Sequence, residues 1–131
     1  MLYVMSDIQQ LQARLRRFAD ERDWGQFHTP KNLVLALIGE VGELAAEVQW
    51  LTDGEVQRRL AAPALRERVA DEIAGVFIYL VRFADITGID LLSTAYSKIE
   101  RNESRYPVDL ARGQSTKHTQ LGKSIGTEHH E

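Results

Sequence analysis

One segment, residues 30–51, constrains the fold of this chain more than any other. Its apolar residues are Leu33, Val34, Leu35, Leu37, Ile38, Val41, Leu44, Ala45 and Val48. They would cover nearly the whole circumference of a helix, and a helix that is apolar on all sides is expected to be buried. Thr29-Pro30 is a good start for it, because threonine can cap a free backbone amide and proline at the first helical position loses no needed donor.

The remainder of the chain also predicts helices. Ser6 or Asp7 can cap a first helix, and a long one should follow Pro63 until Gly88 stops it. Asp90 can cap a last helix, which must end before Pro107. Because no stretch alternates like a strand, we predict an all-α chain, a four-helix bundle. Residues 1–113 should form the helical domain, and residues 114–131 a polar, flexible C-terminal tail.

Composition excludes several classes of function. The 131 residues contain no cysteine, so disulfides, thiolate nucleophiles and cysteine-bound metals are ruled out. The net charge of −3 argues against binding a nucleic-acid polymer, which usually requires a basic excess. No apolar run is long enough to span a membrane, and the first residues do not resemble a signal peptide. We therefore expect a cytoplasmic protein. The apolar central helix further predicts a homodimer or homotetramer.

Three carboxylates interrupt the apolar helix. Glu40, Glu43 and Glu47 are spaced three and four residues apart and share one stripe, with Trp50 next along it. The stripe is either an ordinary solvated face or an ion site. Lysine and arginine, which normally share a solvated face, are absent from it, and this favours the ion site. Carboxylates on a buried helix need a partner, a proton or a metal.

The next helix offers a further carboxylate, Glu72, on a stripe that continues through Gly75, Tyr79 and Arg82. If the two helices pack side by side, Glu40, Glu43 and Glu72 would converge on one hard cation. Oxygen ligands suit Mg²⁺, with Mn²⁺ as the alternative. On the last helix, Lys98, Asn102 and Arg105 share a face that suits an anion such as a polyphosphate, although for this helix alone a solvated face is the favoured explanation.

Three segments together resemble the MazG-like all-α nucleoside triphosphate pyrophosphohydrolases, and within them the dCTP pyrophosphatase type. They read ERDWGQFHTPKNLVLALIGEVGELAAEVQW, DEIAGVFIYLV and SKIERNESRYPVDLARG, in the order and spacing of that family. The resemblance implies magnesium-dependent conversion of a pyrimidine nucleoside triphosphate such as dCTP to the monophosphate and pyrophosphate, which would cleanse nucleotide pools. It also points to oligomers.

The resemblance also assigns roles to individual residues. Members of the family bind magnesium through two glutamates on one helix and a Glu-x-x-Asp pair on the next, which implies metal-binding and catalytic roles for Glu40, Glu43 and Glu72. Further positions match residues that contact the nucleotide in related enzymes. These positions are Trp24, His28 and Trp50 near the base, and Tyr79, Lys98 and Asn102 near the sugar or phosphates.

One position departs from the family pattern. The aspartate of Glu-x-x-Asp is replaced by Gly75, which has no side chain to bind a metal. Three interpretations follow: an active site with water in the gap, a site completed by Asp71, or a nucleotide-binding homologue that is catalytically silent. A di-iron bundle is a more distant alternative, since no glutamate of the helical region is followed three residues later by histidine.

Overall fold

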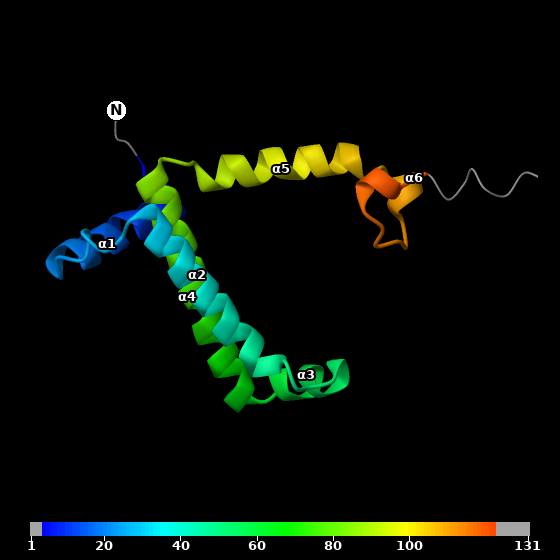
Figure 1. Ribbon diagram of the computed structural model, residues 1–131, viewed down its shortest axis with the longest axis horizontal. Helices are drawn as coiled ribbons and strands as arrows, with labels where there is room; N and C mark the ends of the chain where they lie inside the picture. The colour runs from blue at the N-terminus through cyan, green and yellow to red at the C-terminus, as the bar shows by residue number, and fades with distance from the viewer. Residues whose placement is uncertain (1–3, 123–131) are drawn as a thin grey trace, which may run out of the picture. The chain divides into compact units, whose positions relative to one another are not determined.

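The computed structural model describes residues 4–122, and over that range every regular element is a helix (Figure 1). The prediction of an all-α chain is therefore confirmed. The elements are α1 (Asp7–Glu21), α2 (Pro30–Val48), α3 (Asp53–Leu60), α4 (Pro63–Thr87), α5 (Leu91–Arg105), α6 (Val108–Ala111) and a short 3₁₀ helix, η1 (His118–Gln120). In the described range no helix is both long and apolar enough to cross a bilayer.

Helix ends follow the capping signals of the sequence. The side chains of Ser6, Thr29 and Asp90 each accept a hydrogen bond from a backbone amide in the first turn of α1, α2 and α5. At the other end of α4, Gly88 adopts a left-handed conformation with φ of 70°. Glycine suits this position because a side chain disfavours a positive φ. The expected boundaries of these four helices are thus confirmed to within a few residues.

Helix α3 is the longest of three elements that the sequence analysis missed, the others being α6 and η1. The Thr52-Asp53-Gly54 segment suggested a simple connection, because aspartate and glycine are typical turn residues. In the structure Thr52 and Glu55 form a capping box: the Glu55 amide donates to Thr52 Oγ1 (3.2 Å), and the Thr52 amide donates to Glu55 Oε1 (3.3 Å). These reciprocal bonds satisfy backbone donors at the start of the helix and explain why these eight residues form a helix.

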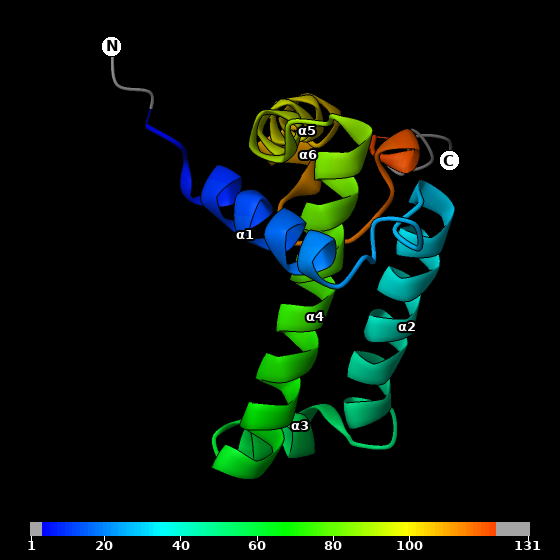
Figure 2. The same ribbon diagram turned by 90° about the vertical axis from the view of Figure 1, so that its left-hand side faces the viewer.

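The chain divides into two compact units, one ending at Ile89 and the other beginning at Asp90. In the first unit α4 is the common packing partner of α1, α2 and α3. Figures 1 and 2 show α2 and α4 side by side, with α1 across the C-terminal half of α4. The second unit contains α5, α6 and η1, and in it the rings of Tyr106 and His118 meet edge to face with centroids 5.6 Å apart. The four-helix bundle and the domain boundary at residue 113 stay predictions, and residues 123–131 of the predicted tail lie outside the described range.

The expectation of a buried α2 is wrong for the single chain. Of its apolar side chains only Leu33 is buried, whereas Leu35 is 59% and Ile38 60% exposed. The reason is that α2 packs mainly against α4, which covers one of its faces. The buried apolar core of the described chain is correspondingly small: it consists of Ala19, Leu33, Leu65, Val81 and Ala84.

Candidate active site

The facing sides of α2 and α4 bring together the three carboxylates singled out in the sequence. Glu40 and Glu43 lie one turn apart on α2, and Glu72 lies opposite them on α4. One carboxylate oxygen from each lies within 4.8 Å of the others. The side chains of Glu40 and Glu72 are half-buried and that of Glu43 is exposed. The group is therefore open to solvent on one side, as a site for a small ligand must be.

Lost hydration and neighbouring negative charge change the acidity of Glu72. The pKa of Glu72 is raised to about 7, first because its carboxyl loses hydration, then through the hydrogen bond to and the charge of Glu43, and then through Glu40. Such a rise means that the ionised form lacks compensating positive charge. The donor set consists of oxygens alone, which fits a hard cation such as Mg²⁺ or Mn²⁺. Within the described residues these three side chains are the ones that fit a metal ion.

Gly75 lies directly beneath one of these carboxylates. A Cβ atom built on Gly75 would lie 2.8 Å from Glu40 Cδ and closer still to Glu40 Oε2. Real Cβ atoms essentially never approach another heavy atom so closely. The Glu40 carboxylate therefore occupies the space that a side chain at position 75 would need. The end of a glutamate side chain can swing aside at little cost, so this contact does not by itself require glycine, which weakens a helix interior by about 1 kcal/mol relative to alanine.

The two other acidic residues near this stripe lie outside the group. Asp71 is exposed and does not belong to the three-carboxylate cluster. Glu47 is paired instead: Arg68 Nε of α4 donates to Glu47 Oε2 at 2.9 Å. The glutamate stripe of α2 has no lysine or arginine of its own, and at Glu47 the positive charge is supplied by α4.

A separate cavity of about 240 Å³ lies between α1, the loop after it and α4. Its walls are almost entirely apolar or aromatic, with one imidazole and one guanidinium. The lining residues are Leu15, Phe18, Trp24, His28, Ile78, Tyr79 and Arg82. Phe18 and Trp24 meet edge to face, with ring centroids 5.6 Å apart. An apolar, aromatic-lined cavity with a few polar groups is suited to a ring-shaped ligand.

The cavity collects three of the six residues that the sequence analysis linked to a nucleotide, namely Trp24, His28 and Tyr79. Trp50 is not among its lining residues, and its side chain is 86% exposed just beyond α2. Lys98 and Asn102 lie on α5 in the second unit. Their roles, like that of Trp50, stay predictions.

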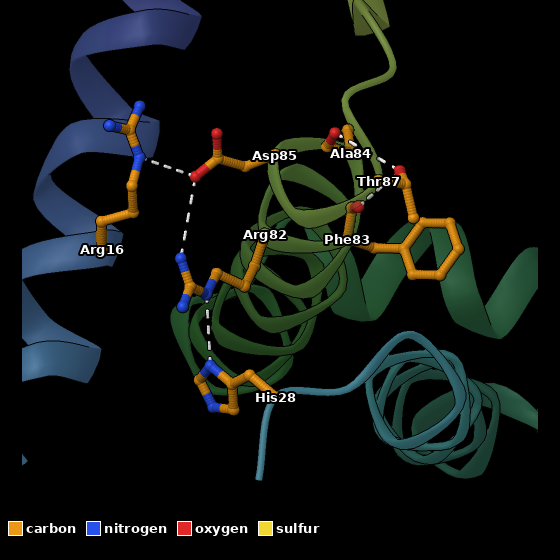
Figure 3. A network of polar contacts seen from close by, with 7 residues as sticks. All are labelled: Arg16, His28, Arg82, Phe83, Ala84, Asp85 and Thr87. Atoms are coloured by element: carbon orange, nitrogen blue, oxygen red, sulfur yellow. Dashed lines mark hydrogen bonds and ion pairs between the residues drawn. The ribbon is translucent and has the colours of Figure 1, made fainter. Parts of the chain in front are cut away.

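Arg82 is the polar residue of the cavity to which the sequence analysis gave no role. Its Nε donates to His28 Nδ1 at 3.2 Å, and its Nη1 lies 3.7 Å from Asp85 Oδ2 (Figure 3). Arg16 Nε of α1 donates to the same Asp85 oxygen at 2.7 Å. Loss of hydration and then the charge of Arg82 lower the pKa of His28. The available signal was the stripe of α4, which places Arg82 one turn after Tyr79.

The raised pKa of Glu72 predicts how stability depends on pH when no metal is bound. A carboxyl whose pKa is about 7 in the folded state and about 4.5 when unfolded stabilises the fold most when it is protonated. The free energy of unfolding should therefore fall as pH rises from 4.5 to 7, and the contribution should be lost above that range. Thermal unfolding in a chelator between pH 4.5 and 8 measures this. Glu72→Gln should flatten this part of the profile, and an unchanged profile would contradict the assignment.

The comparisons with known proteins identify the class. A family model described as the MazG-like family matches residues 39–121, which include the three carboxylates and three of the seven residues that line the cavity. The chain therefore belongs to the MazG-like family. A solved pyrophosphatase from Archaeoglobus fulgidus superposes with a TM-score of 0.74 at 34% identity, covering 82% of this chain and 98% of that one.

Curated relatives indicate the type within the MazG-like family. The chain is 48% identical over 117 residues to human dCTP pyrophosphatase 1, an alignment that covers 89% of this chain and 67% of the human protein. It is 44% identical over 124 residues to the rat dCTP pyrophosphatase 1, covering 95% and 71% respectively. The resemblance to the dCTP pyrophosphatase type, first seen in three separate segments of the sequence, is confirmed.

Proposed function

We propose that this chain is a magnesium-dependent nucleoside triphosphate pyrophosphohydrolase that converts dCTP, or a related pyrimidine nucleotide, to the monophosphate and pyrophosphate. The observation that carries the proposal is the pairing of a three-carboxylate cluster with an aromatic cavity on one helix. Glu72 and Tyr79 are seven residues apart on α4, which places them on one face about 10 Å apart along the axis. A nucleotide with its base in the cavity would extend its phosphates toward the carboxylates.

The reaction needs positive charge at the phosphates and a positioned water. Water adds to the α-phosphorus, the bond from that phosphorus to the bridging oxygen breaks, and pyrophosphate leaves. Magnesium, when bound, would neutralise the phosphates and lower the pKa of the attacking water. Glu40, Glu43 and Glu72 would hold the metal, with Mn²⁺ as a substitute. Trp24 would offer an aromatic face to the base, and His28 and Tyr79 polar edges to the base and sugar.

The direct test is pyrophosphate release by the purified chain from dCTP in the presence of magnesium. Other nucleoside triphosphates and a chelator serve as controls. Release that requires the metal and favours pyrimidines supports the proposal. Release of inorganic phosphate alone would overturn it, because it would mean that a different bond is cleaved.

A second function has one observation in its favour, the glycine at position 75. A family member without the fourth carboxylate could bind nucleotide and fail to turn it over. Isothermal titration with dCTP and Ca²⁺ separates the two functions. Binding without subsequent pyrophosphate release in magnesium identifies the silent homologue, whereas release identifies the enzyme.

A homo-oligomer, dimer or tetramer, is proposed on the basis of the exposed apolar side chains of the α2–α4 pair. These side chains are Val34, Leu35, Ile38 and Val41 on α2, and Ile73 and Phe77 on α4. Apolar surface on this scale usually marks an interface. Light scattering coupled to size exclusion should therefore show no stable monomer in dilute solution. Ile38→Glu should shift the protein toward the monomer, whereas Trp50→Glu is the matched control. A monomer in the unmodified chain would contradict the proposal.

A further inference from the structure

The guanidinium of Arg82 is the most buried charged group of the described chain, with only 7% of the residue exposed. It lies between His28 and Asp85, and its Nε proton is directed at His28 Nδ1 (Figure 3). A neutral imidazole carries one donor and one acceptor nitrogen. Since Nδ1 accepts from Arg82, which cannot give up its proton, the imidazole proton must be on Nε2.

The charge of Arg82 is balanced from the side away from His28. Asp85 faces the guanidinium at 3.7 Å and also accepts from Arg16 of α1 at 2.7 Å. A buried cation is tolerated when it is paired and hydrogen-bonded in this way. Polar contacts therefore run from Arg16 of α1 through Asp85 and Arg82 of α4 to His28 in the loop, at the wall of the aromatic cavity. Both Arg82 and His28 line that cavity.

We propose that Arg82 is a positioning residue that fixes His28 as a neutral imidazole with its proton on Nε2, so that the cavity offers an N–H donor to its ligand. The ligand is then a ring that carries a hydrogen-bond acceptor at its edge, such as the carbonyl oxygen of a pyrimidine. The nature of this ring rests on the proposed function. The tautomer of His28 does not, because it follows from the contacts of the chain itself.

Two replacements of Arg82 form a matched pair. Arg82→Lys retains a long cationic donor for His28 Nδ1 and Asp85, whereas Arg82→Met keeps a similar length and removes the donor. In Arg82→Met, Asp85 keeps Arg16 as a partner, so no buried charge is left alone. ¹⁵N spectra of the imidazole should show the Nε2–H form in the unmodified chain and in Arg82→Lys. In Arg82→Met the Nδ1–H form should appear, and the pKa of His28 should rise toward its ordinary value.

Kinetics then separate positioning from a merely structural role. In Arg82→Met the ligand should lose the neutral hydrogen bond from His28 Nε2–H. KM for dCTP should then rise about three- to tenfold with kcat nearly unchanged, and Arg82→Lys should have a KM close to that of the unmodified chain. In a His28→Ala background, Arg82→Met should have no further effect on KM. An Nδ1–H imidazole in the unmodified chain, or an equal rise in KM without His28, overturns the proposal. If no variant releases pyrophosphate, the proposed function fails, while the ¹⁵N spectra of the unmodified chain still decide the tautomer.

Discussion

Glu72→Gln is expected to lower pyrophosphate release from dCTP by about a hundredfold to a thousandfold or more. The replacement keeps the size of the side chain and one oxygen, but it removes the charge that would hold the metal against α4. Losing one preorganised electrostatic contact at a reacting centre typically costs this much. The measurement is kcat/KM at saturating magnesium, with the magnesium dependence recorded for each variant. Activity within threefold of the unmodified chain would exclude Glu72 from the metal site.

Glu47→Gln is the matched control, because Glu47 shares the α2 stripe and yet pairs with Arg68 outside the cluster. An ion pair of this kind contributes at most about 1 kcal/mol, so Glu47→Gln should keep nearly full activity. Stability provides a second readout. Above pH 7 without metal, Glu72→Gln should unfold at a higher temperature than the unmodified chain, because it removes a carboxylate whose ionised form is disfavoured by lost hydration and by Glu43 and Glu40. Loss of activity with a gain in stability cannot be explained by misfolding.

The convergence of these carboxylates could be anticipated because it depends on local rules. Helical spacing places Glu40 and Glu43 on one side of α2, and caps such as Thr29 and Gly88 set where the helices begin and end. These signals act within a few residues, and a single sequence contains them. The helix limits followed from them, whereas the side-by-side packing of α2 and α4 had to be assumed and is supplied by the structure.

Features that depend on distant parts of the chain could not be predicted in the same way. The bond from Arg82 to His28 joins residues 54 positions apart, and no periodicity of either segment contains it. The exposure of α2 was also misjudged. A helix that is apolar all round must bury its surface, but the sequence does not show whether the same chain or another copy buries it. The Arg68–Glu47 pair was missed for the same reason, because the compensating charge comes from another helix.

The second prediction concerns Gly75 and compares two variants, Gly75→Ala and Gly75→Asp, with the unmodified chain. Gly75→Ala adds a Cβ where Glu40 now lies, so the Glu40 carboxylate must swing away from its place in the cluster. The end of a glutamate moves at little cost, and alanine favours the helix by about 1 kcal/mol, so the fold should be retained. The magnesium concentration for half-maximal activity should rise about tenfold or more, because one ligand is misplaced.

Gly75→Asp also moves the end of Glu40, but it adds a carboxylate beside it, and a metal bound by both would bring Glu40 back into the cluster. With four carboxylates, the metal-free protein should be less stable than the unmodified chain above pH 7, and magnesium should bind more tightly. We expect half-maximal activity at about one tenth of the magnesium concentration that the unmodified chain needs, with a smaller change in kcat. If only the aspartate variant releases pyrophosphate, three carboxylates do not suffice and the unmodified chain is the silent homologue. If the alanine variant matches the glycine form at every magnesium concentration, the position of Glu40 over residue 75 is irrelevant to the metal, and Asp71 or water must complete the site instead.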